Sequence, residues 1–113
     1  MVRIKRSVYR IRKICALVKI YGPYCFWCNR RFSKEDLSSL YIDHYVARYH
    51  GGSDDISNLR PACFHCNGSK NYSTFEEWLK FITEQKKEAS WKYRRFARIY
   101  KKLKEVIQKE SKA

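Results

Sequence analysis

The sequence has 113 residues, of which 44% are hydrophobic, and a formal net charge of +14. This length fits one small domain with a helical extension, and the hydrophobic share argues against a wholly disordered chain. The chain lacks any apolar run near the ~20 residues of a membrane span, and its first residues lack the apolar stretch of a secretory signal. We therefore expect an intracellular, cytoplasmic protein without a membrane partner, whose reduced cysteines bind metal in preference to forming disulfides.

The positive charge is concentrated at the two ends of the chain. Residues 1–20 hold seven basic and no acidic residues, residues 21–72 hold six and five, and residues 73–113 hold twelve and six. We accordingly divide the chain into a basic N-terminal helix (1–22), a central core (23–72) and a basic C-terminal helical region (73–113). Nucleic acid is the common partner of such flanks, and an anionic membrane surface or solubility alone are the alternatives.

Residues 3–20 have the spacing of an amphipathic helix, which Gly22-Pro23 would end. The apolar positions recur at steps of four and three, on one predicted face: Ile4, Val8, Ile11, Cys15 and Val18. On this face we expect Cys15 to be a small buried hydrophobic residue.

The middle of the chain predicts short elements joined by loops. Ser33 and Asp36 have capping-box spacing, which indicates a helical turn at 34–38. A short strand is expected at 40–42, running into Asp43-His44. Residues 51–55 have the composition of a turn. The proline in Leu59-Arg60-Pro61 restricts a second strand to the edge of a sheet.

The C-terminal region is predicted to be helical. Ser73 with Glu76 and Thr74 with Glu77 are overlapping capping boxes. The apolar residues that follow them are Phe75, Trp78, Leu79 and Ile82, and a second series in the stretch 90–110 is Phe96, Ile99, Leu103 and Val106. Whether these belong to one long helix or two is open.

Two Cys-x-x-Cys pairs, Cys25 with Cys28 and Cys63 with Cys66, are separated by 34 residues. Each pair brings two thiolates to one ion, and two pairs complete the tetrahedral shell of a structural zinc site. A metal that closes such a long loop also stabilises a core of this size. We expect one structural Zn2+ per chain, with a redox pair as the alternative.

The segment between and after these pairs contains four further features. They are Asp43-His44, Gly51-Gly52, Asn58-Leu59 and, after the last cysteine, Asn67-x-x-Lys70. In this order and spacing, residues 24–72 resemble the HNH endonuclease family. The resemblance implies an α+β fold: a small ββα-metal core stapled by a four-cysteine zinc site and flanked here by basic amphipathic helices. It also implies metal-dependent hydrolysis of DNA phosphodiester bonds.

The resemblance assigns a role to each matching residue. His44 is the general base that activates water, and Asn58 bonds the loop backbone and so orients the strand that carries His44. Asp43 and Asn67 hold the catalytic metal, for which their oxygens favour Mg2+ or Mn2+. Lys70 contacts phosphate. Because Asp43 and His44 are adjacent in an extended segment, a bulge or a strand end must reconcile their opposite directions.

A basic run with interleaved aromatic residues lies in the C-terminal region, from Trp91 and Lys92 to Lys104. We expect double-stranded DNA to contact this run and the core through Arg48, Lys70, Arg94, Arg95, Arg98, Lys101 and Lys102. The apolar seams on residues 4–18 and 96–106 either form a homodimer or only cover the core. A zinc module that binds nucleic acid without cleaving it, and an RNA-directed nuclease or toxin, are the rival hypotheses.

Overall fold

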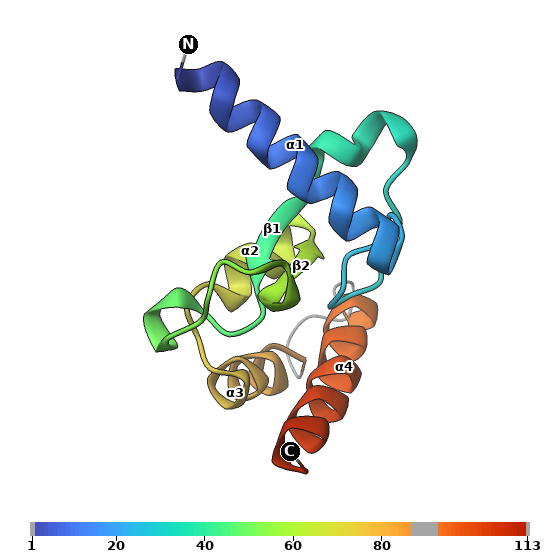
Figure 1. Ribbon diagram of the computed structural model, residues 1–113. Coiled ribbons are helices and arrows are strands. Elements are labelled where there is room, and N and C mark those ends of the chain that lie inside the picture. Colours follow the sequence, from blue (N-terminus) through green and yellow to red (C-terminus); the bar gives the residue numbers. More distant parts are fainter. Residues whose placement is uncertain (1, 87–92, 113) are drawn as a thin grey trace.

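The computed structural model describes residues 2–86 and 93–112 and contains both helices and strands (Figure 1). The longer elements are α1 (Val2–Tyr21), β1 (Tyr41–His44), β2 (Leu59–Ala62), α2 (Phe64–Lys70), α3 (Phe75–Lys86) and α4 (Tyr93–Ser111). Three short 3-10 helices lie between them, namely η1 (Lys34–Ser39), η2 (Arg48–His50) and η3 (Ile56–Asn58). The predicted α+β class is confirmed. Within the described residues, no helix combines the length and the apolar character that crossing a membrane requires.

The centre of the fold is an antiparallel pair of strands followed by a short helix. Tyr41 pairs with Ala62 at one end and His44 with Leu59 at the other, without an interruption of the register. Pro61 is accommodated because each strand of a two-stranded sheet has a free edge. β1, β2 and α2 thus form the expected ββα arrangement. Of the two alternatives expected at Asp43-His44, a bulge or a strand end, the structure has the strand end, because the register is uninterrupted and His44 is the last residue of β1.

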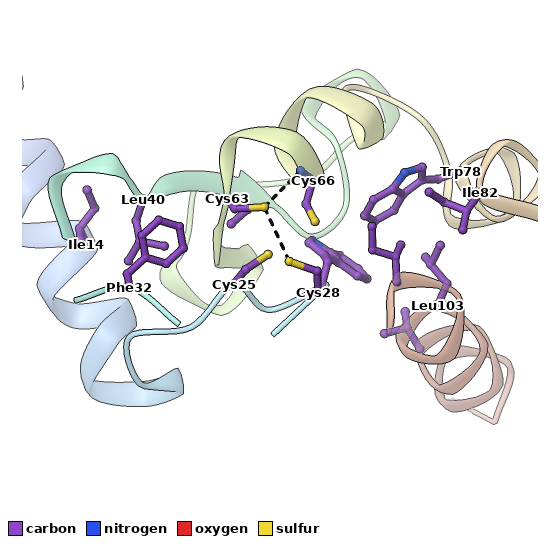
Figure 2. Packing of buried hydrophobic residues seen from close by; sticks show 14 residues of the cluster. Ile14, Cys25, Cys28, Phe32, Leu40, Cys63, Cys66, Trp78, Ile82 and Leu103 are labelled. Atoms are coloured by element: carbon purple, nitrogen blue, oxygen red, sulfur yellow. Dashed lines mark hydrogen bonds between the residues drawn. The ribbon is translucent and has the colours of Figure 1, made fainter. Parts of the chain in front are cut away.

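The four cysteines of the two pairs lie between two groups of apolar side chains. Figure 2 shows Ile14, Phe32 and Leu40 on one side of the sulfur atoms and Trp78, Ile82 and Leu103 on the other. All of these residues belong to one buried cluster. The cluster therefore contains side chains from all three segments predicted from the charge distribution.

α1 agrees with the helix predicted at 3–20, but it buries a different face. Ile14 and Leu17 are buried, whereas Val8, Ile11 and Cys15 are exposed. The prediction of a buried Cys15 is therefore wrong. The N-terminal half of α1 extends away from the rest of the molecule (Figure 1), and among the described side chains of α1 those in or against the core cluster are Ile14 and Val18.

The C-terminal region forms two helices, which lie side by side (Figure 1). At the start of α3, the Thr74 backbone N–H donates to Glu77 Oε1 at 2.8 Å, and the Glu77 N–H donates to Thr74 Oγ1 at 3.1 Å. This is the reciprocal pattern of a capping box. In α4 the predicted seam covers the core, because Ile99, Leu103 and Val106 are all buried. Residues 87–92, which include Trp91 and Lys92, lie outside the described residues.

The capping box predicted at Ser33 is not formed. η1 begins after Ser33, as expected, but the Ser33 hydroxyl donates to Asp36 Oδ2 at 2.9 Å and does not bond a backbone N–H. In a 3-10 turn the backbone is wound more tightly than in an α-helix, so the two side chains meet each other directly.

Candidate active site

The sulfur atoms of Cys25, Cys28, Cys63 and Cys66 lie within 4.8 Å of one another and are buried (Figure 2). Cys63 is also the N-cap of α2, where its Sγ accepts a hydrogen bond from the Cys66 N–H at 3.4 Å. Contact with Cys25 lowers the pKa of Cys63 and raises the pKa of Cys66, so the thiols share protons unequally. Four buried thiolates would repel one another without a cation, and this donor set fits a tetrahedral zinc ion.

Asp43 lies on the inner side of β1, next to the cysteine cluster, and is only 4% exposed. Its Oδ2 accepts a hydrogen bond from the indole Nε1 of Trp27 at 2.9 Å, which links the strand to the first cysteine pair. Its Oδ1 lies 3.3 Å from the ammonium of Lys70. Burial raises the pKa of Asp43, while Lys70 and Trp27 act in the opposite direction.

Lys70 departs from the expected phosphate contact. It is 1% exposed, and its Nζ donates to the His44 carbonyl oxygen at 2.7 Å as well as to Asp43. The end of α2 thereby holds the last residues of β1. A buried ammonium needs a counter-charge, and Asp43 provides it within the core. This ammonium therefore neutralises a protein carboxylate, and its contact with a phosphate stays a prediction.

His44 occupies the opposite side of β1, at the end of the strand, and its side chain is 21% exposed. Its Nε2 lies 2.7 Å from Asp54 Oδ1, and the Arg48 Nε donates to the same oxygen at 2.8 Å. The hydrogen bonds from His44 and Arg48 lower the pKa of Asp54. Since a carboxylate only accepts hydrogen bonds, the proton of the neutral imidazole lies on Nε2, and Nδ1 carries the free lone pair.

Asn58 holds the loop that follows His44. Its Oδ1 accepts from the Val46 N–H at 2.9 Å, and its Nδ2 donates to the carbonyl oxygens of Val46 and Ser53 at 3.0 and 2.8 Å. The loop also passes so close to Val46 that a Cβ on Gly52 would lie 1.7 Å from its carbonyl oxygen. A residue without a side chain is therefore required there. Together these contacts place Asp54 beside His44.

The other predicted site residues lie on two separate parts of the molecule. Asn67 is half-buried on α2 and its role as a metal ligand stays a prediction. The predicted DNA-contacting residues of α4 are exposed or half-buried, namely Arg94, Arg95, Arg98, Lys101 and Lys102. Sequence reasoning gave no role to Trp27 or Asp54, which contact Asp43 and His44. Trp27 lies within the first cysteine pair and Asp54 follows the double glycine, and these positions are the sequence features that could have identified them.

This geometry can be set beside proteins of related sequence. Residues 25–73 match the family model described as HNH endonuclease. The central segment of the chain is therefore an HNH endonuclease domain, as its motifs indicate. The chain is also 59% identical over 65 residues to the SPbeta prophage-derived protein YoqL of Bacillus subtilis (strain 168), which is itself named as a candidate HNH endonuclease. No solved structure matches the chain.

The similarity to YoqL covers part of each protein. The matched region spans 51% of this chain and 27% of the relative. The chain thus covers about a quarter of that protein.

Proposed function

We propose that the protein is a metal-dependent endonuclease that hydrolyses phosphodiester bonds of double-stranded DNA, with His44 as the general base. The observation that carries this proposal is the placement of His44. Its imidazole is partly exposed at the end of β1, bonded through Nε2 to Asp54 and positioned next to a loop that Asn58 holds. Within an HNH segment, this is the arrangement of a base whose orientation is fixed by a neighbouring carboxylate.

The hydrogen bond to Asp54 assigns the reacting atom of His44. Nδ1 accepts a proton from a water molecule, the water oxygen attacks the phosphorus, and the bond from phosphorus to the 3′-oxygen breaks. The leaving 3′-oxygen takes a proton from solvent, so the products carry a 5′-phosphate and a 3′-hydroxyl. The imidazolium that forms is stabilised by the Asp54 carboxylate, which already accepts a hydrogen bond from Arg48. Asp54 is thus a positioning residue for the base.

Two kinds of metal belong to this proposal. The four cysteines would hold one structural Zn2+. Asp43 and Asn67 are the proposed ligands of Mg2+ or Mn2+, ions that prefer carboxylate and amide oxygens. Both Asp43 oxygens are engaged by Trp27 and Lys70 here, so binding of such an ion would replace the Lys70 contact. Such an ion, when bound, supplies positive charge to the transition state and to the leaving 3′-oxygen. Lys70 already contributes one positive charge beside Asp43.

A plasmid cleavage assay tests the proposal. Zinc-loaded wild type, His44→Ala and His50→Ala are incubated with supercoiled DNA in Mg2+, in Mn2+ and without either ion. His50 is a matched control because it is a second histidine of the same loop region with no role in the proposed chemistry. We expect metal-dependent cutting by wild type and His50→Ala, and a roughly 10²- to 10⁴-fold lower rate for His44→Ala.

Each outcome separates the hypotheses. Nicked product indicates one active site acting alone, and linear product indicates two sites, as in a two-fold dimer. Equal cutting by wild type and His44→Ala would contradict the role of His44. Binding of the duplex without cutting in either metal would favour a binding module, and cutting of RNA alone would favour an RNA-directed nuclease.

A further inference from the structure

A basic groove runs between the first cysteine pair and α4. It consists of three clefts of about 440, 340 and 300 Å³. Asn29 and Arg98 line both the first and the second cleft, and Phe26, Lys102 and Glu105 line both the second and the third. We call this continuous surface the knuckle–helix groove. Its cationic lining residues are Arg30, Arg31, Arg60, Arg94, Arg95, Arg98, Lys101, Lys102 and Lys109, and Glu105 is the one carboxylate among its lining residues.

The first wall of the groove is built on the cysteine pair. The chain turns sharply after Cys28, where Asn29 has a positive φ of 63°. The Cys25 N–H donates to the Arg30 carbonyl oxygen at 2.9 Å, and the Asn29 N–H donates to the Cys25 carbonyl oxygen at 3.0 Å. The backbone of Arg30 is therefore fixed by the same turn that presents the cysteine sulfurs, and its guanidinium lies 4.8 Å from the ring centre of Phe32.

The second wall is the basic face of α4. Ile99 and Leu103 are buried on the opposite face of this helix, so Arg98, Lys101 and Lys102 are directed outward along the groove. From residue 94 to residue 109 the helix rises about 22 Å at 1.5 Å per residue. That length equals roughly six nucleotide steps of 3.4 Å along a DNA strand. A free phosphate would fill only a small part of it.

The floor of the third cleft places cations on aromatic rings. The Arg60 guanidinium lies 4.2 Å from the ring centre of Tyr45, and the Lys102 ammonium lies 4.4 Å from that of Phe26. Arg60 Nη1 donates to the carbonyl oxygens of Ser57 and Leu59, but its Nε is buried without a hydrogen-bond partner in the described part of the chain.

We propose that the knuckle–helix groove binds the sugar–phosphate backbone of the DNA substrate, as a site additional to the one around His44. The proposal rests on the proposed function for the identity of the polyanion. Neighbouring arginines repel one another unless an anion screens them, and their forked donors match phosphate oxygens. The third cleft reaches Tyr45, the residue after His44, so one end of the groove lies beside the end of β1. Because the cysteine turn fixes Arg30, the zinc site also organises one wall of this groove.

The test is binding of a fluorescent duplex of about twenty base pairs, measured by anisotropy between about 50 and 200 mM salt without Mg2+ or Mn2+. The groove variant is Arg94→Gln/Arg95→Gln/Arg98→Gln. The control variant, Arg12→Gln/Lys19→Gln/Lys34→Gln, loses the same charge at exposed positions outside the groove. Three lost phosphate contacts should reduce the slope of log K against log salt by about 2.7, and affinity at the lower salt concentration by at least tenfold. The control should retain the wild-type slope.

Equal losses in the groove and control variants would overturn the proposal, since the effect would then come from net charge alone. Unchanged DNA binding together with lost binding to phosphatidylserine-containing vesicles would overturn it in favour of a membrane surface. The anisotropy test measures binding alone, and the plasmid assay measures cleavage separately. A wild type that binds DNA through the groove but does not cut the plasmid would contradict the nuclease function and still support the groove. A wild type that cuts the plasmid, together with a groove variant whose duplex affinity is unchanged, would support the nuclease function and contradict the groove.

A second variant should raise the affinity for the duplex instead of lowering it, and it leaves every cation of the groove in place. Glu105→Gln removes the carboxylate of the groove at an exposed position of α4. We expect duplex affinity to rise by a factor of about two to five, the size of an exposed charge interaction. The neighbouring exposed carboxylate Glu110 bonds the Tyr45 hydroxyl and does not line the groove, so Glu110→Gln is the comparison. Weaker binding by Glu105→Gln would contradict the proposal.

Discussion

The two faces of β1 provide opposite surroundings for two adjacent residues. Asp43 is enclosed by Trp27, Lys70 and the cysteine cluster, whereas His44 lies at the surface beside Asp54 and Arg48. The pairing with β2 is regular through both residues, so the alternation of a pleated strand is sufficient to separate them. A single dipeptide thus joins a region that stabilises the fold to a region whose side chains are available for chemistry.

This difference makes two kinds of substitution distinguishable. Changes on the inner face remove buried charge, metal or packing and should lower the free energy of unfolding. Changes on the outer face should alter catalysis while the thermal midpoint stays close to that of wild type. The expected effects below run from the largest to the smallest.

Removal of one cysteine from the inner face should have the largest effect. Cys63→Ser deletes one of the four clustered sulfurs, while the serine hydroxyl can still accept the N-cap hydrogen bond of α2. A structural zinc site contributes about 10 kcal/mol or more to folding, which is comparable to the whole unfolding free energy of ~5–15 kcal/mol. We expect this variant to lack zinc by elemental analysis and to show no cooperative melting by circular dichroism.

Cys15→Ser is the matched control, because Cys15 is exposed and lies outside the cluster. It should retain one zinc per chain and the wild-type melting curve. A Cys63→Ser protein that melts at the wild-type temperature would show that the cysteine cluster does not stabilise the fold.

Lys70→Met should have the next largest effect. It leaves the Asp43 carboxylate buried without its counter-charge, a loss of about 3–5 kcal/mol in the free energy of unfolding. Urea titration of the zinc-loaded protein measures this change. Lys80→Met, at an exposed position of α3, should change stability by less than about 0.5 kcal/mol. Equal small changes in both variants would mean that the buried pair does not hold α2 against β1.

Asp54→Asn should distinguish the outer face of β1 from the inner face most clearly, because it should lower DNA cleavage without lowering stability. An amide can donate to His44 Nε2, which would move the imidazole proton to Nδ1 and remove the proposed base. We expect DNA cleavage to fall by about tenfold to a hundredfold with an unchanged melting temperature. Asp55→Asn, at the neighbouring exposed position, should cleave as wild type does. A large loss of stability in Asp54→Asn, with cleavage intact, would place Asp54 in the fold and not in the site.

The smallest effect is expected at the start of α3, where its size depends on pH. The Thr74 N–H lowers the pKa of Glu77 below its ordinary value of 4.5. The charge of Glu77 therefore stabilises the folded state above pH 4.5, and this stabilisation is lost as the pH falls through the folded-state pKa. Glu77→Gln keeps an oxygen acceptor but not the charge. Its melting temperature should lie slightly below that of wild type at neutral pH, and the difference should shrink below pH 4.5.

Glu76→Gln provides the comparison for this pH series, because Glu76 is a neighbouring exposed carboxylate of the same first turn. Its melting temperature should follow that of wild type at each pH. A difference between Glu77→Gln and wild type that grows on acidification would contradict the assigned sign.

Local patterns predicted local structure well. The capping box at Thr74 and Glu77 was visible in the sequence because its partners are three residues apart, and the proline in β2 correctly limited that strand to an edge. The two cysteine pairs were equally informative, since the metal-like cluster follows from short spacing within each pair.

Features that depend on distant partners were not predictable in the same way. The period of α1 identified an apolar face, but it could not indicate that the N-terminal half of the helix extends away from the rest of the molecule, where Val8 and Ile11 are exposed. Lys70 was assigned to the surface because its counter-charge, Asp43, lies 27 residues earlier in the chain. Asp54 lies ten residues after His44, and only the folded loop brings them together.

The exposure of Cys15 has a practical consequence for labelling this protein. Of its five thiols, Cys15 alone is accessible, and the other four are enclosed together in the core. A chromogenic disulfide reagent should therefore report one fast-reacting thiol in the native protein and four more when the core opens. The same side chain accepts a maleimide fluorophore on α1 and does not line the knuckle–helix groove, so the chain carries its own labelling position.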